Sequence, residues 1–250
     1  MLAWRQRNGA LAGLAAVALL CWAWLVPAAL DMQGDMRGLA AWMMPAHWDA
    51  TYASLIFAMW AVMMIAMMLP SAAPTALLYE RVARSDMRAG DPALRACFFA
   101  SGYLVVWCGY ALAATALQWA LSASNLLTPM MRTRGHLLAA ALLIVAGAWQ
   151  WTPLKRRCLQ RCREPAAFIA SEWRAGTGGA WRMGVRLGLS CLGCCWAMML
   201  LLFVGGVMNL AWIVAISLGV LLEKFLPDGV PTGRAFGAVL IVAGAALLVS

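Results

Sequence analysis

Seven long apolar runs, separated by short polar or basic segments, govern how this chain can fold. They cover residues 10–30, 54–69, 97–121, 136–151, 185–204, 207–222 and 235–249. Hydrophobic residues occupy 64% of the 250 positions and charged residues 12%, whereas soluble domains are about half apolar and a quarter charged. A helix needs about 20 apolar residues to cross a bilayer. The sequence therefore predicts an all-α membrane protein, a polytopic bundle of about seven transmembrane helices.

The runs are predicted to be helices rather than strands. They lack the alternation of barrel strands, and a lone strand in lipid would leave its backbone N–H and C=O groups unpaired. Glycines four residues apart, at Gly184 and Gly188 and again at Gly233 and Gly237, would let neighbouring helices approach closely. We expect a single integral membrane domain, residues 1–250, whose main partner is the lipid bilayer.

The distribution of positive charge predicts the orientation. If the seven runs alternate, all but three of the 19 Lys and Arg residues lie on the same side as the N-terminus. The exceptions are Arg37, Arg132 and Arg134. Because positive residues close to the spans stay in the cytoplasm, the N-terminus should be cytoplasmic and the C-terminus external. The net charge of +9 is then a topology signal, and no nucleic-acid partner is expected.

The second apolar run is rich in methionine. Spacings of three and four residues place five thioethers on one side of one helix, namely Met59, Met63, Met64, Met67 and Met68. Thioether sulfur is a neutral, soft ligand that suits Cu(I) and tolerates hydrocarbon surroundings. The alternative is that methionine is flexible apolar filler. Pro70 and Pro74 should end or kink this helix, more naturally as its end at the inner membrane surface.

The fifth run carries a second set of sulfur ligands. Helical spacing places three thiols and two thioethers on one face, namely Cys191, Cys194, Cys195, Met198 and Met199. A Cys-x-x-Cys pair on a helix can bind a soft metal through thiolates or cycle as a redox disulfide. Apolar burial raises the pKa of a thiol, so metal capture with proton release is the more workable chemistry. The remaining interpretation is that these cysteines are small apolar residues that only fill the core.

A basic segment between the fourth and fifth runs holds Cys158 and Cys162, four residues apart. If the segment is helical, both sulfurs face the same way. Neighbouring cations favour thiolates, so these two residues are candidates to receive metal at the inner surface. A short interfacial helix with incidental thiols fits equally well.

These motifs resemble a bacterial family catalogued as domain of unknown function 2182 and described as predicted metal-binding integral membrane proteins. The resemblance covers most of the chain. It is carried by Met63 to Pro70, by Gln150 to Lys155 with the following Cys158 and Cys162, and by Gly188 to Trp196. Trp149 departs from it, because the family commonly has Tyr at this position. The resemblance implies a metal-associated role, sometimes described as that of a copper chaperone, in the bacterial inner (cell) membrane.

Together the motifs predict a non-enzymatic protein that binds Cu(I) between the second and fifth spans for transfer or transport. Its partner would be a copper donor or acceptor protein. One alternative is a membrane thiol-disulfide redox enzyme that uses Cys191, Cys194 and Cys195. The other is a non-catalytic membrane assembly subunit, in which the sulfur residues are packing and no metal binds.

The predicted orientation has a direct test. A reporter that is active only outside the cytoplasm should be active when fused after Ser250, because an odd number of spans beginning inside must end outside. The same reporter fused after Arg174, in a basic inner segment, should be inactive. If the fusion at Ser250 were well expressed but its reporter inactive, one span would have been miscounted.

Overall fold

The computed structural model describes residues 2–34, 38, 41, 43, 47–85, 90–226 and 229–249, with side chains from residue 12 onward. Arg37 and Ser250, which enter the orientation argument, lie outside these residues. The described chain is helical, and its β-type pairing is an isolated bridge between Leu127 and Thr133. The helices are α1 Leu2–Gln33, α3 Ala50–Ser85, α4 Pro92–Ala123, α5 His136–Gln150, α6 Pro153–Arg163, α7 Pro165–Glu172, α8 Gly176–Leu200, α9 Leu202–Gly205, α10 Leu210–Phe225 and α11 Gly229–Val249. The predicted all-α class is confirmed.

Helix length limits the number of complete spans. Within the described residues five helices are long and apolar enough to cross a membrane, and the count is six if α5 and α6, which meet at 65°, form one broken span. This is fewer than the predicted seven. The helices α5 and α10 have only 15 and 16 residues, or about 22–24 Å at 1.5 Å per residue, against a hydrocarbon core of about 30 Å.

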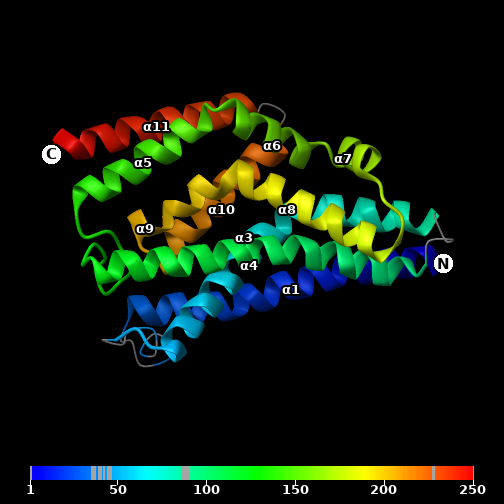
Figure 1. Ribbon diagram of the computed structural model, residues 1–250, viewed down its shortest axis with the longest axis horizontal. Helices are drawn as coiled ribbons and strands as arrows, with labels where there is room; N and C mark the ends of the chain where they lie inside the picture. The colour runs from blue at the N-terminus through cyan, green and yellow to red at the C-terminus, as the bar shows by residue number, and fades with distance from the viewer. Residues whose placement is uncertain are drawn as a thin grey trace.

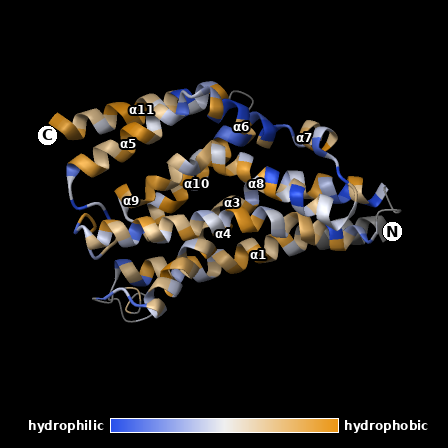
Figure 2. Ribbon diagram, viewed as in Figure 1, coloured by the Kyte–Doolittle hydropathy of each residue, from blue (hydrophilic) through white to orange (hydrophobic). Residues whose placement is uncertain are grey.

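The bundle is elongated, and its two termini lie at opposite ends of the long axis (Figure 1). The helix α4 packs between α3 and α8, while α11 packs along α5. Apolar side chains point outward on the peripheral helices, where Leu20, Val239 and Val242 are 70%, 64% and 68% exposed. Such a surface suits lipid rather than water. Hydrophilic residues gather instead along α6 and at the ends of neighbouring helices (Figure 2).

The chain reverses between α9 and α10 at a glycine pair. Gly206 has a φ of 100°, a left-handed conformation that residues with a Cβ rarely adopt. Asn209 then caps α10, because its side-chain oxygen accepts a hydrogen bond from the Trp212 backbone N–H at 3.2 Å. The chain thus breaks at Gly205 and Gly206, and α10 runs back toward α6 (Figure 1).

The two prolines of α3 do not end that helix. It continues through Pro70 and Pro74 to Ser85, so the expectation of a helix end at this position is wrong. Pro70 lacks the N–H that would bond to the carbonyl of residue 66. The indole Nε1 of Trp22, from α1, donates to the Ala66 carbonyl at 3.1 Å instead. A tertiary hydrogen bond thus replaces the one that the proline removes.

Small residues set the spacing of the central helices, as predicted. A Cβ on Gly184 would collide with the carbonyl oxygen of Phe99, and one on Gly188 would lie 2.9 Å from Val106 Cβ. On the other side of the bundle, a Cβ on Gly237 would lie 2.8 Å from the Gly147 carbonyl oxygen. Backbone contacts of this kind hold α4 against α8 and α5 against α11.

We predict that Gly184→Val destabilises the protein, because the added atoms must push α4 away from α8, at a cost of about 1–3 kcal/mol. Gly109→Val is the matched control, since a Cβ there meets nothing within 4 Å. Unfolding in mixed micelles of a neutral detergent and SDS measures both. Equal midpoints for the two variants would contradict the packing argument.

Candidate metal centre

The methionine face of α3 is turned into the protein. Met59, Met63, Met64 and Met68 have no exposed surface, and Met67 is 1% exposed. These residues belong to the central hydrophobic core. Met59 lies about 13 Å along the helix axis from Met68, at 1.5 Å per residue. The stripe therefore follows the bundle axis through its interior rather than surrounding one point.

The cysteines of α8 meet this stripe at Met68. Cys195 Sγ lies 3.8 Å from Met68 Sδ, which brings α3 and α8 together through their sulfur side chains. The Cys194 and Cys195 thiols donate to the Cys191 carbonyl oxygen at 3.0 and 2.9 Å. All three thiols are buried, at 1–2% exposure. The predicted shared face of α8 is thus present and points inward.

The basic segment contributes a fourth thiol. It forms the helix α6, with Pro153 in the first turn and Thr152 as the cap that accepts from the Lys155 N–H at 3.2 Å. The thiol of Cys162 on this helix interacts with the thiols of Cys191 and Cys194. We call Met68, Cys162, Cys191, Cys194 and Cys195 the sulfur cluster.

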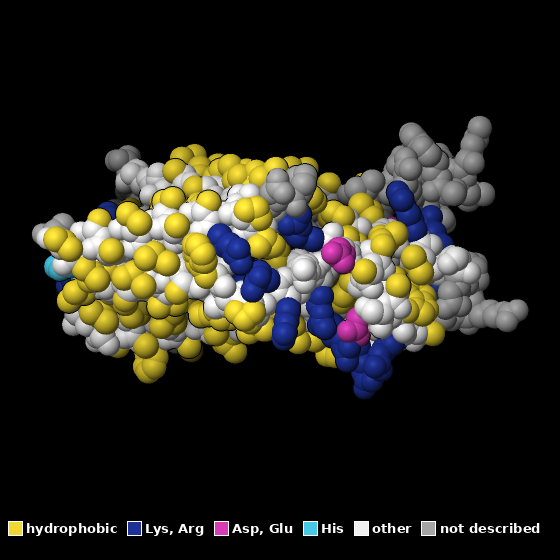
Figure 3. Space-filling view, turned by 90° about the horizontal axis from the view of Figure 1, so that it is seen from above, with side chains coloured by type: hydrophobic (Ala, Val, Ile, Leu, Met, Phe, Trp, Pro, Cys, Tyr) yellow, Lys and Arg dark blue, Asp and Glu magenta, His cyan; other side chains and the backbone are white. Residues whose placement is uncertain are grey.

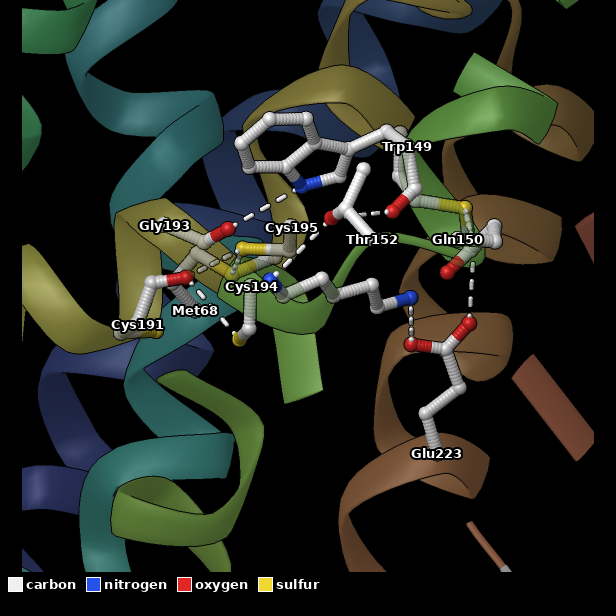
Figure 4. Close-up of polar contacts among 11 residues, drawn as sticks. Met68, Trp149, Gln150, Thr152, Cys191, Gly193, Cys194, Cys195 and Glu223 are labelled. Carbon is white, nitrogen blue, oxygen red and sulfur yellow. Dashed lines mark hydrogen bonds and ion pairs between the residues drawn. The ribbon is translucent and has the colours of Figure 1, made fainter. Parts of the chain in front are cut away.

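Cys158 lies beside the sulfur cluster rather than within it. Its Sγ packs on Gly193, where a Cβ would come within 2.7 Å of the sulfur. Gly193 precedes Cys194, so Cys158 is separated from the buried thiols by one residue of α8 backbone. The indole of Trp149 donates to the Gly193 carbonyl at 3.1 Å, as Figure 4 shows. The residue that departs from the resembled family therefore supports this corner of the site.

A buried lysine reaches the cluster from α10. Lys224 Nζ donates to Cys191 Sγ at 3.0 Å and to Ser71 Oγ at 2.8 Å. The Tyr103 hydroxyl lies 3.2 Å from Cys191 Sγ and donates to the Met68 carbonyl at 3.2 Å. Cys191 is thus the thiol with the most polar surroundings, and a nearby ammonium favours its thiolate form.

A second buried polar group ties α6 to α10. Lys155 Nζ lies 2.6 Å from Glu223 Oε2, with side chains only 3% and 5% exposed. Gln150 Nε2 donates to Glu223 Oε1 at 2.9 Å (Figure 4). It also donates to Met198 Sδ at 3.0 Å, so Met198 faces this amide. The ion pair fixes the helix that carries Cys158 and Cys162.

Lys155 and Lys224, two of the positive residues on the predicted inner side, have partners inside the protein. Both side chains are buried, one in the ion pair and one at the thiols. Glu223 was missed, and Gln150 was named only as part of the family resemblance. Their position beside long apolar runs was the available signal, because polar and ionisable residues within a membrane domain usually have a functional partner.

The structure brings together only part of the predicted ligand set. The sulfur cluster and neighbouring Cys158 come from α3, α6 and α8. The other predicted methionines of α3 lie further along that helix, namely Met59, Met63, Met64 and Met67. On α8, Met198 contacts Gln150 and Met199 is buried in the core. In the described part of the chain all cysteines are free thiols. There, no three Cys, His, Asp or Glu side chains are arranged to hold one metal ion. The thiols engage one another and the backbone instead.

The fold and site define a helical membrane protein with a buried cluster of thiols and a thioether. Residues 57–247 match the PpoB2 family, described as copper chaperone, so the chain belongs to that family. The match confirms the expected association with copper. No curated protein and no solved structure matches the chain.

We predict that Glu223→Gln strongly destabilises the protein, because it leaves the Lys155 ammonium buried without its counter-charge, at a cost of about 3–5 kcal/mol. Arg186→Gln is the control, since its pair with Glu172 is half exposed and such pairs contribute about 0–1 kcal/mol. Unfolding in mixed micelles compares the two. The double variant Lys155→Met/Glu223→Met should recover much of the loss, and similar midpoints for Glu223→Gln and Arg186→Gln would contradict the assignment.

Proposed function

We propose that this protein binds Cu(I) in the sulfur cluster and passes it on, as a copper chaperone built into a membrane. The observation that carries the proposal is the convergence of three buried thiols, the half-buried Cys162 thiol and the Met68 thioether from three helices. Thiolates and thioethers are the ligands that Cu(I) prefers. The resemblance to the family catalogued as domain of unknown function 2182 belongs to the same proposal.

The charges around the cluster favour a monovalent ion. Two thiolates and one Cu(I) carry a net charge of −1, which is costly to hold in an apolar interior. The Lys224 ammonium, 3.0 Å from Cys191 Sγ, supplies the balancing charge. Loading requires Cys194 and Cys195 to rotate away from the Cys191 carbonyl and one or more thiols to release a proton. The remaining methionines of α3 would then serve as weaker ligands along a route toward the opposite end of the bundle.

A thiol-disulfide enzyme remains a second candidate, because the contact between Lys224 and Cys191 is also typical of a reactive thiolate. In that case Cys162 or Cys194 would be the resolving thiol. Purified protein would then hold a disulfide between two of these residues after mild oxidation and no copper after copper loading. Mass spectrometry of the thiol state, together with elemental analysis under reducing conditions, separates the two functions.

Replacing Cys191, Cys194 and Cys195 by Ser should lower Cu(I) affinity by at least about 100-fold, or about 2.8 kcal/mol. Replacing Met63 and Met67 by Leu should slow loading and leave the affinity nearly unchanged, because thioethers bind more weakly than thiolates. Competition with a chromogenic Cu(I) chelator in detergent measures affinity, and its time course measures loading.

The control replaces Cys97 and Cys108 by Ser, since neither thiol is buried and neither belongs to the sulfur cluster. This variant should keep both the affinity and the copper stoichiometry of the original protein. If the triple Ser protein does the same, the cluster is packing and the proposed function is wrong.

A further inference from the structure

A hollow between α6 and α7 lies directly outside the sulfur cluster. It has a volume of about 540 Å³ and is lined by both helices, with Cys158 among its walls. This volume suits a small molecule rather than a folded domain, since ligand sites are typically about 300–1,000 Å³. Lys and Arg side chains gather along the middle of this face of the molecule, whereas its left part is apolar (Figure 3).

The hollow presents more positive than negative charge to a ligand. Arg157 and Arg161 are exposed, lie one helical turn apart and form no ion pair with another described residue. Glu172 is neutralised by Arg186, whereas Glu164 begins α7 without a side-chain capping bond. Two cations and one anion are therefore presented to a ligand. A zwitterion with two carboxylates and one ammonium complements this set.

The hollow also contains a thiol, that of Cys158. Cys158 reaches the hollow on one side and packs on Gly193, the residue before Cys194, on the other. It is half-buried, whereas Cys194 is buried. A Cu(I) ion that exchanges onto Cys158 is thus one step from the cluster. Gly193 permits this approach because any side chain there would displace the Cys158 sulfur.

We propose that the hollow between α6 and α7 binds a small zwitterionic peptide thiol of net negative charge, which exchanges Cu(I) with the protein through Cys158. The exchange needs no redox partner. The bond between copper and the peptide sulfur breaks as the bond to Cys158 forms, and the proton of the Cys158 thiol passes to the departing peptide thiolate. Arg157 and Arg161 hold the two carboxylates and Glu164 holds the ammonium. This inference rests on the proposed function of the sulfur cluster.

The test uses copper-loaded full-length protein in neutral detergent under reducing conditions. Reduced glutathione is the probe, cysteamine is the cationic comparison thiol, and a chromogenic chelator reports the released Cu(I). Glutathione should accelerate release about tenfold more than cysteamine at equal thiolate concentration, as expected for electrostatic guidance by a charged site. Arg157→Glu/Arg161→Glu should abolish this preference. Arg156→Glu, on the same helix but outside the hollow, is the control and should preserve it.

Cys158→Ser should slow release with both thiols, because it removes the thiol through which Cu(I) leaves. Equal rates with the two thiols in the original protein, or a preference that survives Arg157→Glu/Arg161→Glu, would overturn the inference. So would loss of the preference on adding an anionic phospholipid to the micelles, since the hollow would then be a headgroup site. Failure of the original protein to bind Cu(I) would overturn the proposed function as well.

Discussion

The buried ion pair between Lys155 and Glu223 determines the position of α6, the helix that the basic segment of the sequence forms. Without it, a helix with five basic residues would have little reason to lie against an apolar bundle. The pair joins α6 to α10 at 2.6 Å, and the next residue of α10, Lys224, contacts Cys191. One turn of α10 therefore fixes both the helix that carries Cys158 and Cys162 and the charge beside the thiols. Burying two ions is costly, so the arrangement favours one defined position over maximal stability.

Burial and charge balance act together at the sulfur cluster. The apolar surroundings discourage free thiolates, while the ammonium of Lys224 favours one thiolate at Cys191. A soft monovalent cation can then enter without a large change in the net charge of the interior. Neutral Met68 adds a ligand and no charge. Under the proposed function, this combination accounts for thiols and thioethers, rather than carboxylates, in the interior of the bundle.

Much of this architecture could be predicted from periodicity. Apolar run length gave the helical membrane class, and spacings of three and four residues identified the inward faces of α3 and α8. The periodicity of apolar residues could not show that α5 and α10 are too short for a full span. It also could not show that α3 continues through Pro70 and Pro74. The continuation depends on Trp22, which is 44 residues away from Ala66 in the sequence. Likewise, a lysine next to an apolar run reads as a topology signal until its distant carboxylate or thiol partner is known.

The ion pair also has a consequence for the order of assembly. Lys155 and Glu223 are 68 residues apart in the sequence, so Lys155 has no counter-charge until α10 has been made. During synthesis α6 is therefore more stable in water or among headgroups than in its final position. Over the same interval Cys191 lacks the Lys224 ammonium that contacts it in the complete fold. The charges that surround the cysteines are thus completed late in the biogenesis of the protein, when α10 has joined the bundle.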